Sequence, residues 1–406
     1  MKKNRLYEIL GVNNDLELKE FARKSGVSVK KLKYYSEELI LPAEDDLQKI
    51  LQSSGLTELE FKLKLGILDR KIISILGDKA SEISQLLGND YPRELQDNFS
   101  IKPCFQTELG KLYQADCLQL MRTLPKESVD LIFADPPFNL NKSYESGIND
   151  KLSKMEYLDW TEEWVLSCVN LLKEGGSFFV WNLPIWNTYI SEILNRHLTF
   201  RHWIAVDIKY RLPIQNRLYP SHYSLLYYTK GEKPSTFNTQ RLPLEICRHC
   251  GGDYRDYGGY KDKLNINGIN LSDVWYDIPP VRHSKYKTRE SNELSLKLLD
   301  RIISLASNEG DLVFDPFGGS GTTYITSELL GRNWIGCEIG PINTIINRFQ
   351  DIQYHREYLD KIRLSTNKLF TEEARRLREK NGHWLPETLN KKKNDNKAQQ
   401  LDIFEK

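Results

Sequence analysis

The sequence lacks long apolar runs, and it has few cysteines and almost no net charge. No stretch is apolar over the length of a membrane-spanning helix, and the first residues, MKKNRLYEIL, show no signal-peptide pattern. Six cysteines are scattered over 406 residues, and only Cys247 and Cys250 lie close together, which excludes a disulfide framework. A net charge of +1 means that any nucleic-acid surface must come from local clusters. We therefore expect a cytoplasmic protein without membrane spans.

The beginning of the chain differs in pattern from the rest. Apolar residues recur at helical spacing over residues 1–90, and Gly26, Gly55 and Gly66 interrupt the pattern. A polar stretch that contains proline follows at residues 91–110. We predict an all-α domain at 1–90 and a linker at 91–110.

Short apolar runs alternate with amphipathic stretches over residues 111–370, which predicts an α/β domain with a mixed, largely parallel sheet. Residues 232–275 are rich in Gly, Asn, Asp and Tyr and break the alternation, so we expect an inserted loop region there. Residues 371–406 are charged and predict a flexible tail. The strand candidates are LYQAD, VDLIFA, SFFVWN, HWIAVDI, SLLYYT, DLVFD and NWIGCEI.

A glycine-rich turn, DPFGGSGTT at residues 315–323, follows one of these strand candidates. Gly318, Gly319 and Gly321 permit a tight turn and a close approach of a ligand to the backbone. Glu338 ends the next strand candidate, where a carboxylate can accept hydrogen bonds from ribose hydroxyls. The loop lacks the Gly-Lys-Ser/Thr of a triphosphate-binding loop. The whole unit predicts a site for a nucleoside cofactor.

A second motif, LIFADPPFNL at residues 131–140, places two rigid prolines and an aromatic ring directly after an acid. Together, Asp135-Pro136-Pro137-Phe138 and the loop at 317–321 resemble the motifs of the DNA amino-methyltransferases. These S-adenosylmethionine-dependent enzymes methylate exocyclic amines of adenine or cytosine. The resemblance covers roughly residues 110–350, and the order of the motifs is that of the family's permuted β group. It implies a Rossmann-like methyltransferase fold with S-adenosyl-L-methionine as cofactor.

The amine chemistry explains the residue types of the catalytic motif. The lone pair of an exocyclic amine is delocalised into the ring, and hydrogen bonds to Asp135 and to the Pro136 carbonyl would localise it on nitrogen. Pro137 helps to hold these acceptors rigidly, and Phe138 would stack on a base rotated out of the duplex. Asp at the first motif position favours adenine, because cytosine enzymes more often carry Ser there.

The resemblance also implies roles for residues outside the catalytic motif. Asp116 is expected at the adenine of the cofactor, Asp315 at its amino group, and Asn292 with Glu293 at its methionine end. The segment 139–150 is expected to form a mobile loop over the rotated base. The expected cofactor loop consists of Phe317, Gly318, Gly319, Ser320, Gly321 and Thr322, with Glu338 at the ribose.

The segment FARKSGVSVKKLKYYSEEL fits a helix-turn-helix, in which Ser28 caps a recognition helix. The alternative is a helical bundle with ordinary surface lysines, and a role in target placement or in repression of its own promoter stays open. Apolar residues expected to face inward are Phe21, Val27, Leu32 and Tyr35. Residues expected to face the major groove are Lys30, Lys31, Lys33 and Tyr34.

Three shorter motifs lead to weaker expectations. Pro103-Cys104 lies in the linker and is interpreted as an ordinary cysteine, not a ring-attacking nucleophile. CRHCGG at 247–252 supplies only three possible zinc ligands, so we predict no metal site. The tail segment Gln400, Leu401, Asp402, Ile403 and Phe404 resembles the peptide with which bacterial replication proteins dock on the sliding clamp. A chance pentapeptide, or a tail that folds back on its own domain, are the alternatives.

The leading interpretation is a site-specific adenine-N6 methyltransferase of duplex DNA in a bacterial modification or restriction-modification system. Cytosine-N4 methylation, methylation of RNA or of protein amides, and a DNA-binding regulator with a non-catalytic methyltransferase fold are the alternatives. No nuclease domain is evident in the sequence, so any restriction activity would belong to a partner endonuclease.

Overall fold

The computed structural model describes residues 5–88, 101–140, 152–207, 214–216, 218–242, 244–247, 268–278, 293–366 and 372–385, with a few positions between 249 and 265. Two compact units divide the chain: residues 1–100 with 137–167, and residues 101–136 with 168–406. Within the described ranges, no helix has both the length and the apolar character needed to cross a membrane. The predictions for Asn292, for the tail peptide 400–404 and for most of the segment 139–150 lie outside the described residues, as do parts of the linker, of the insertion and of CRHCGG.

The helices of the first unit begin and end where local chemistry requires. Ser28 caps α3, because its hydroxyl accepts a hydrogen bond from the backbone N–H of Lys31. Gly26, Gly55 and Gly66 end their helices in the left-handed region, with φ of 71°, 73° and 77°, so the predicted breaks are confirmed. The helices among residues 1–100 are α1 (Arg5–Leu10), α2 (Asp15–Ser25), α3 (Val29–Glu38), α4 (Glu44–Ser54), α5 (Glu58–Leu65), α6 (Arg70–Asp78) and α7 (Ala80–Leu87).

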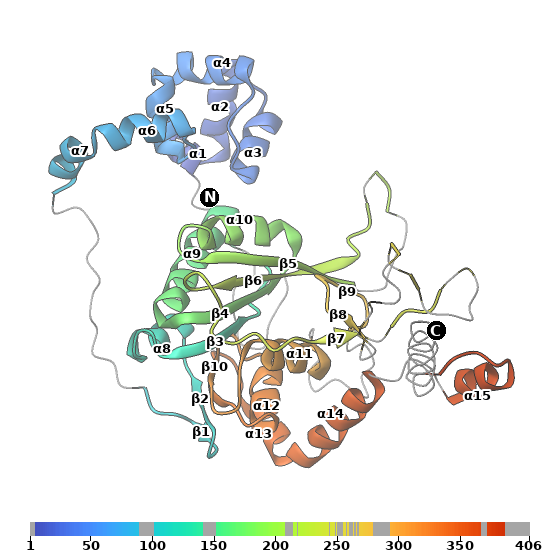
Figure 1. Ribbon diagram of the computed structural model, residues 1–406. Coiled ribbons are helices and arrows are strands. Elements are labelled where there is room, and N and C mark those ends of the chain that lie inside the picture. The colour runs from blue at the N-terminus through green and yellow to red at the C-terminus, as the bar shows by residue number, and fades with distance from the viewer. Residues whose placement is uncertain are drawn as a thin grey trace, which may run out of the picture. The chain divides into compact units, whose positions relative to one another are not determined.

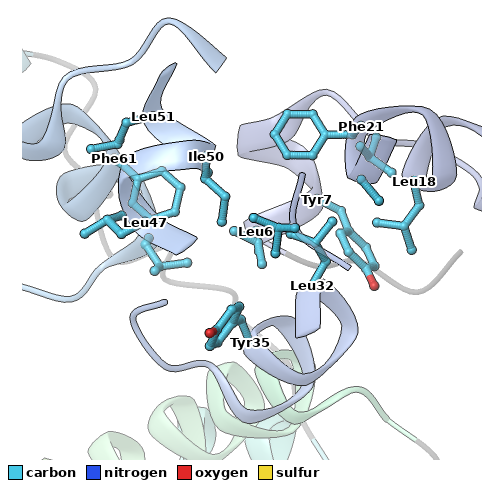
Figure 2. Close-up of a cluster of buried hydrophobic side chains, with 14 residues drawn as sticks. Leu6, Tyr7, Leu18, Phe21, Leu32, Tyr35, Leu47, Ile50, Leu51 and Phe61 are labelled. Atoms are coloured by element: carbon cyan, nitrogen blue, oxygen red, sulfur yellow. The ribbon is translucent and has the colours of Figure 1, made fainter. Parts of the chain in front are cut away.

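One apolar core holds α1 to α5 together, and Figure 2 shows its side chains converging. Burial of a Leu or Phe side chain stabilises a fold by about 1.5–3 kcal/mol, so this cluster is sufficient to define a small domain. Helices α6 and α7 contribute no buried residue to it. All four residues expected to face inward are buried: Phe21, Val27, Leu32 and Tyr35.

A nine-stranded sheet forms the centre of the second unit, in the order β1-β2-β11-β10-β3-β4-β6-β5-β9 (Figure 1). Strands β2, β11, β10, β3 and β4 are parallel, while β6 runs antiparallel to β4 and β5. The prediction of a mixed, largely parallel sheet is confirmed. The strands are β1 (Phe105–Gln106), β2 (Gly110–Gln114), β3 (Val129–Ala134), β4 (Leu172–Asn182), β5 (Thr199–Asp207), β6 (His222–Thr229), β9 (Val274–Trp275), β10 (Leu312–Asp315) and β11 (Asn333–Glu338).

Helices cover both faces of this sheet, with α11 and α12 on one side and α8 and α10 on the other (Figure 1). All seven strand candidates are strands in the structure. The two-residue strands β1, β7 (Arg241–Leu242), β8 (Ile269–Asn270) and β9 were not predicted, because two residues carry no periodicity. The remaining helices are α8 (Cys117–Thr123), α9 (Lys154–Leu171), α10 (Pro184–Leu194), α11 (Leu296–Ala306), α12 (Thr322–Leu329), α13 (Asn343–Gln350), α14 (Ile352–Thr366) and α15 (Glu372–Lys380).

Candidate functional site

Four acids lie at the carboxyl edge of the parallel strands. Asp116 follows β2, Glu338 ends β11, Asp315 ends β10, and Asp135 follows β3. Because these four strands are neighbours and run in the same direction, their carboxyl ends meet at one edge, where open α/β sheets bind ligands. Burial raises the pKa of Asp315 well above its usual value, and the negative charges of Asp135 and Glu338 add to this effect. The sheet thus brings together residues that the sequence predicted separately.

The carboxylate of Asp315 is built into the glycine loop. It is only 2% exposed, and it accepts hydrogen bonds from the Phe317 backbone N–H at 2.9 Å and from the Thr323 hydroxyl at 2.5 Å. The hydroxyl of Tyr324 donates to the Asp315 carbonyl at 2.9 Å. Asp315 therefore fixes the path of the loop, and its expected contact with the cofactor stays a prediction.

The three glycines of the loop are required for different reasons. A Cβ at Gly318 would lie 2.7 Å from the Tyr324 hydroxyl, and one at Gly321 would lie 2.8 Å from Cγ2 of Ile345. Gly319 has a φ of 54°, in the left-handed region. Packing against the protein itself thus explains Gly318 and Gly321, in addition to the close approach of a ligand that the sequence suggested.

Glu338 closes the other side of the loop. Its Oε2 accepts from the Gly319 backbone N–H at 2.6 Å, and its Oε1 accepts from the Gly340 N–H at 2.7 Å. A carboxylate has about four acceptor positions, so these two bonds leave capacity for ribose hydroxyls. Asp116 caps α8 by accepting from the Leu118 N–H at 2.9 Å. The roles of both acids toward a cofactor stay predictions.

Arg348 holds the end of the glycine loop, and the sequence analysis missed it. From α13 its Nη1 donates to the Ser320 carbonyl at 2.8 Å and to the Thr322 hydroxyl at 3.0 Å. The same nitrogen lies 3.6 Å from a carboxylate oxygen of Glu293, and both side chains are 4% exposed. Its Nε–H donates to His355 at 3.4 Å. No local pattern in NTIINRFQ could have indicated these contacts, because they depend on how α13 packs.

A stacked aromatic pair on β4 and β6 includes Tyr223, which lies near Asp135. Tyr223, at the start of β6, has a raised pKa because it is buried and because Asp135 is nearby. Trp181, near the end of β4, stacks on Tyr223 with ring centroids 4.9 Å apart. One signal in the sequence could have indicated Trp181. It lies at the carboxyl end of SFFVWN, the strand candidate that follows VDLIFA along the chain, and VDLIFA leads to Asp135.

The continuation of the catalytic motif belongs to the first unit. Phe138 is buried, and the carbonyl of Pro137 accepts a hydrogen bond from the Tyr157 hydroxyl at 2.7 Å. Asn139 has a φ of 52°, which is uncommon outside glycine. Its Nδ2 donates to the Leu152 carbonyl at 3.0 Å.

The expected DNA-facing lysines differ in their surroundings. The Lys31 ammonium lies 2.7 Å from Asp46, whose carboxylate is buried and also accepts from the Tyr35 hydroxyl at 2.7 Å. These hydrogen bonds lower the pKa of Asp46. Lys33 lies 3.5 Å from the exposed Asp15. Lys31 thus stabilises the helical bundle, while Lys30 and Tyr34 are exposed. A DNA role for the four residues stays a prediction.

The chemistry of the carboxyl edge fits the expected cofactor. Carboxylates at this edge would repel a phosphate group, whereas they accept hydrogen bonds from hydroxyls and attract an ammonium or sulfonium charge. S-adenosylmethionine carries ribose hydroxyls, an ammonium group and a sulfonium. Asp116, Glu338 and the loop that begins at Asp315 are the residues that would hold it.

Comparisons with known proteins agree with this interpretation. A DNA methylase family model, N6_N4_Mtase, matches residues 129–347. The Type II methyltransferase M.BamHI of Bacillus amyloliquefaciens is 49% identical over 397 residues, covering 95% of this chain and 94% of the relative. The DNA adenine methyltransferase YhdJ of Escherichia coli (strain K12) is 31% identical over 238 residues, covering 58% and 80%. The solved PvuII cytosine-N4-specific methyltransferase aligns with a TM-score of 0.45 at 21% identity, covering 61% and 88%. The chain therefore belongs to the N6/N4 DNA methylase family, whose methyl donor is S-adenosylmethionine.

Proposed function

We propose that the protein is a site-specific DNA methyltransferase of a bacterial restriction-modification system, acting on the N6 amine of adenine in duplex DNA. The observation that supports the proposal is the pairing of β3 with β10, because Asp135 follows β3 and the glycine loop follows β10 on neighbouring parallel strands. The similarity to a Type II methyltransferase over 95% of the chain supports the restriction-modification context.

In this function the protein's own residues supply acceptors and rigidity. Asp135 and the Pro136 carbonyl accept the two N–H groups of the target amine and thereby keep its lone pair on nitrogen. Phe138 stacks on the base after the base has left the duplex. The cofactor supplies an electrophilic methyl group. Since no covalent bond to the protein is needed, catalysis depends on how well these groups are positioned.

The choice of adenine rests on Asp135 alone. Adenine N6 and cytosine N4 present the same two N–H donors, so a carboxylate can serve either base. Methylated plasmid should therefore be digested to nucleosides, and the methylated positions should be sequenced. N6-methyladenine within one recurring site supports the proposal, and N4-methylcytosine would overturn the base while leaving the amine chemistry intact. An absence of any methylated base would favour a non-catalytic DNA-binding protein.

A helix-turn-helix role for α2 and α3 is part of the proposal. Three observations support it: a short connection at residues 26–28, the Ser28 cap and an exposed Lys30. The two helices would then help to place the enzyme on its site.

We also propose, from the sequence of the tail, that Gln400–Phe404 docks on the bacterial sliding clamp. The three apolar residues of this segment suit a hydrophobic groove, and the lysine-rich stretch before it suits a flexible tether. Purified clamp of the host should retain the full-length protein and lose it when Leu401 and Phe404 become alanine. Equal retention of both proteins, or of neither, would contradict the docking role.

A further inference from the structure

Within the Pro136-Pro137 pair of the catalytic motif, one backbone dihedral angle is not restricted by the sequence. Proline fixes φ at Pro136 and Pro137. A residue that precedes proline is restricted in ψ, which applies to Asp135 because Pro136 follows it, and to Pro136 because Pro137 follows it. Of the ψ angles of Asp135, Pro136 and Pro137, only that of Pro137 has no such restriction, because Phe138 comes next. That angle sets the direction of the Pro137 carbonyl, and it contributes to the direction of the Phe138 ring.

A hydrogen bond from Tyr157 holds this remaining angle. The Tyr157 hydroxyl donates to the Pro137 carbonyl at 2.7 Å, a short and well-formed bond. Tyr157 is 2% exposed, and its ring packs against Trp160 with centroids 5.8 Å apart. Because the ring is enclosed, rotation of the Pro137 carbonyl would break this hydrogen bond without a free path for the ring to follow it.

The start of α9 is built to keep Tyr157 in place. The Ser153 hydroxyl accepts from the Glu156 backbone N–H at 3.2 Å, and the Glu156 carboxylate accepts from the Ser153 N–H at 2.8 Å. This reciprocal pair is a capping box, which closes the first helical turn. The Tyr157 backbone N–H donates to the Ser153 carbonyl at 3.0 Å within that turn. Tyr157 therefore projects from a rigid helix end.

The other side of Phe138 is anchored in the same way. Asn139 occupies the left-handed region with φ of 52°, which only glycine adopts freely. Its Nδ2 donates to the carbonyl of Leu152, the residue directly before the capping box. Phe138 thus lies between two residues that are both bonded to the chain at the start of α9.

We propose that Tyr157 is a positioning residue for methyl transfer: by fixing ψ of Pro137 it directs the Phe138 ring onto the target base. Asn139 supports it by holding the next residue. This inference rests on the proposed function, because it assigns Phe138 to stacking on the rotated base. Tyr157 itself touches neither the base nor the cofactor in this role.

The central experiment compares Tyr157→Phe with Tyr228→Phe. Each change removes one buried hydroxyl. The hydroxyl of Tyr228, a residue of β6, donates to Asn195 at 2.8 Å and not to the catalytic motif. DNA carrying the recognition site is methylated in single turnover, and the cofactor Kd, the DNA KM and Tm are measured alongside. In Tyr157→Phe the rate should fall about three- to tenfold, the effect of one hydrogen bond. The cofactor Kd and DNA KM should change less than twofold. Tyr228→Phe should lower Tm similarly without a change in rate.

Base stacking supplies a readout that a purely structural role would not change. With 2-aminopurine at the target position, stacking on Phe138 should quench its fluorescence in the wild type, and Tyr157→Phe should be brighter. Asn139→Gly keeps the backbone conformation and removes the Nδ2 donor. Like Tyr157→Phe, it should lower the rate and raise the fluorescence.

Two results would overturn the inference: a Tyr157→Phe rate within twofold of the wild type, or equal rate losses in Tyr157→Phe and Tyr228→Phe. Asp135→Ala separates this failure from failure of the proposed function. If Asp135→Ala is inactive while Tyr157→Phe is unimpaired, only the positioning role is wrong. If Asp135→Ala is active, the assignment of the catalytic motif itself is wrong.

Discussion

Asp135 is the residue on which the proposed chemistry depends most directly. It follows β3, is partly exposed, and lies near Tyr223. Asp135→Ala removes an acceptor that acts in the transition state, and it leaves in place the hydrogen bonds that Asp315 and Glu338 make within the glycine loop. We expect methylation to be abolished and cofactor binding to change little. Single-turnover assays and calorimetry of cofactor binding check this, and comparable activity in the variant would contradict the role of Asp135.

His355 should make the stability of the fold around Arg348 sensitive to acid. Burial and the neighbouring Arg348 lower the pKa of His355 to about 4, against partial compensation by Asp351. In the unfolded chain His355 takes up a proton near pH 6.5, whereas in the folded chain it stays neutral down to about pH 4. The contribution of His355 to the free energy of unfolding is therefore fully present above pH 6.5 and is lost as the pH falls toward 4. The loss should be about 3 kcal/mol at most.

Chemical denaturation at pH 5 and pH 7 tests this expectation. His355→Gln keeps an acceptor for the Arg348 Nε–H but cannot take up a proton in this range. The free energy of unfolding of the variant should therefore depend less on pH than that of the wild type. Identical pH dependence of the two proteins would exclude His355 as the cause.

At the scale of elements, the glycine loop ties β10, β11 and α12 together. Gly319→Val places a β-branched residue at a φ of 54° and disturbs the bond from the Gly319 N–H to Glu338. Cofactor affinity should fall at least about tenfold, the effect of 1.4 kcal/mol. Gly310→Val is the matched control, because Gly310 has a φ of 84° with open space around it, at the opposite end of β10. It should lower Tm without weakening cofactor binding, as calorimetry can show.

Arg348 connects α13 to the same loop through hydrogen bonds to Ser320 and Thr322, and it forms a buried ion pair with Glu293. Arg348→Met would leave the Glu293 carboxylate without its ion-pair partner and release the Ser320 carbonyl. We expect a loss of about 3–5 kcal/mol in the free energy of unfolding, together with weaker cofactor binding. Adding Glu293→Gln should recover part of the stability, because a neutral side chain costs less to bury once Arg348 is replaced. A double variant as unstable as the single one would contradict this account.

Elements with a repeating pattern could be predicted, and contacts across the fold could not. The seven longer strands and the glycine-ended helices follow from apolar periodicity and from the conformational freedom of Gly26, Gly55 and Gly66. The meeting of Asp116, Asp135, Asp315 and Glu338 depends on strand order, which a single sequence does not specify. Arg348 and Tyr157 depend on helix packing and carry no local signal at all.

At the scale of the whole molecule, a lysine of the N-terminal bundle can affect the stability of the bundle as well as DNA binding. The pairing of Lys31 with the buried Asp46 means that replacing Lys31 would destabilise α3 and α4 whether or not it contacts DNA. A test of DNA binding that removes all the lysines of α3 together would therefore mix two effects. Lys30 and Lys33 separate them, because both are exposed and the ion-pair partner of Lys33, Asp15, is exposed as well.

Changing Lys30 and Lys33 to alanine should weaken DNA binding and flatten its salt dependence. Each phosphate contact that is lost lowers the slope of log K against log salt by about 0.9. Thermal unfolding should be nearly unchanged, because exposed lysines contribute little to stability. Lys19→Ala with Lys49→Ala, exposed lysines on α2 and α4, provides a control with the same change in charge. An equal slope for the two double variants would show that α3 has no particular role in DNA binding, and that the bundle serves the enzyme in another way.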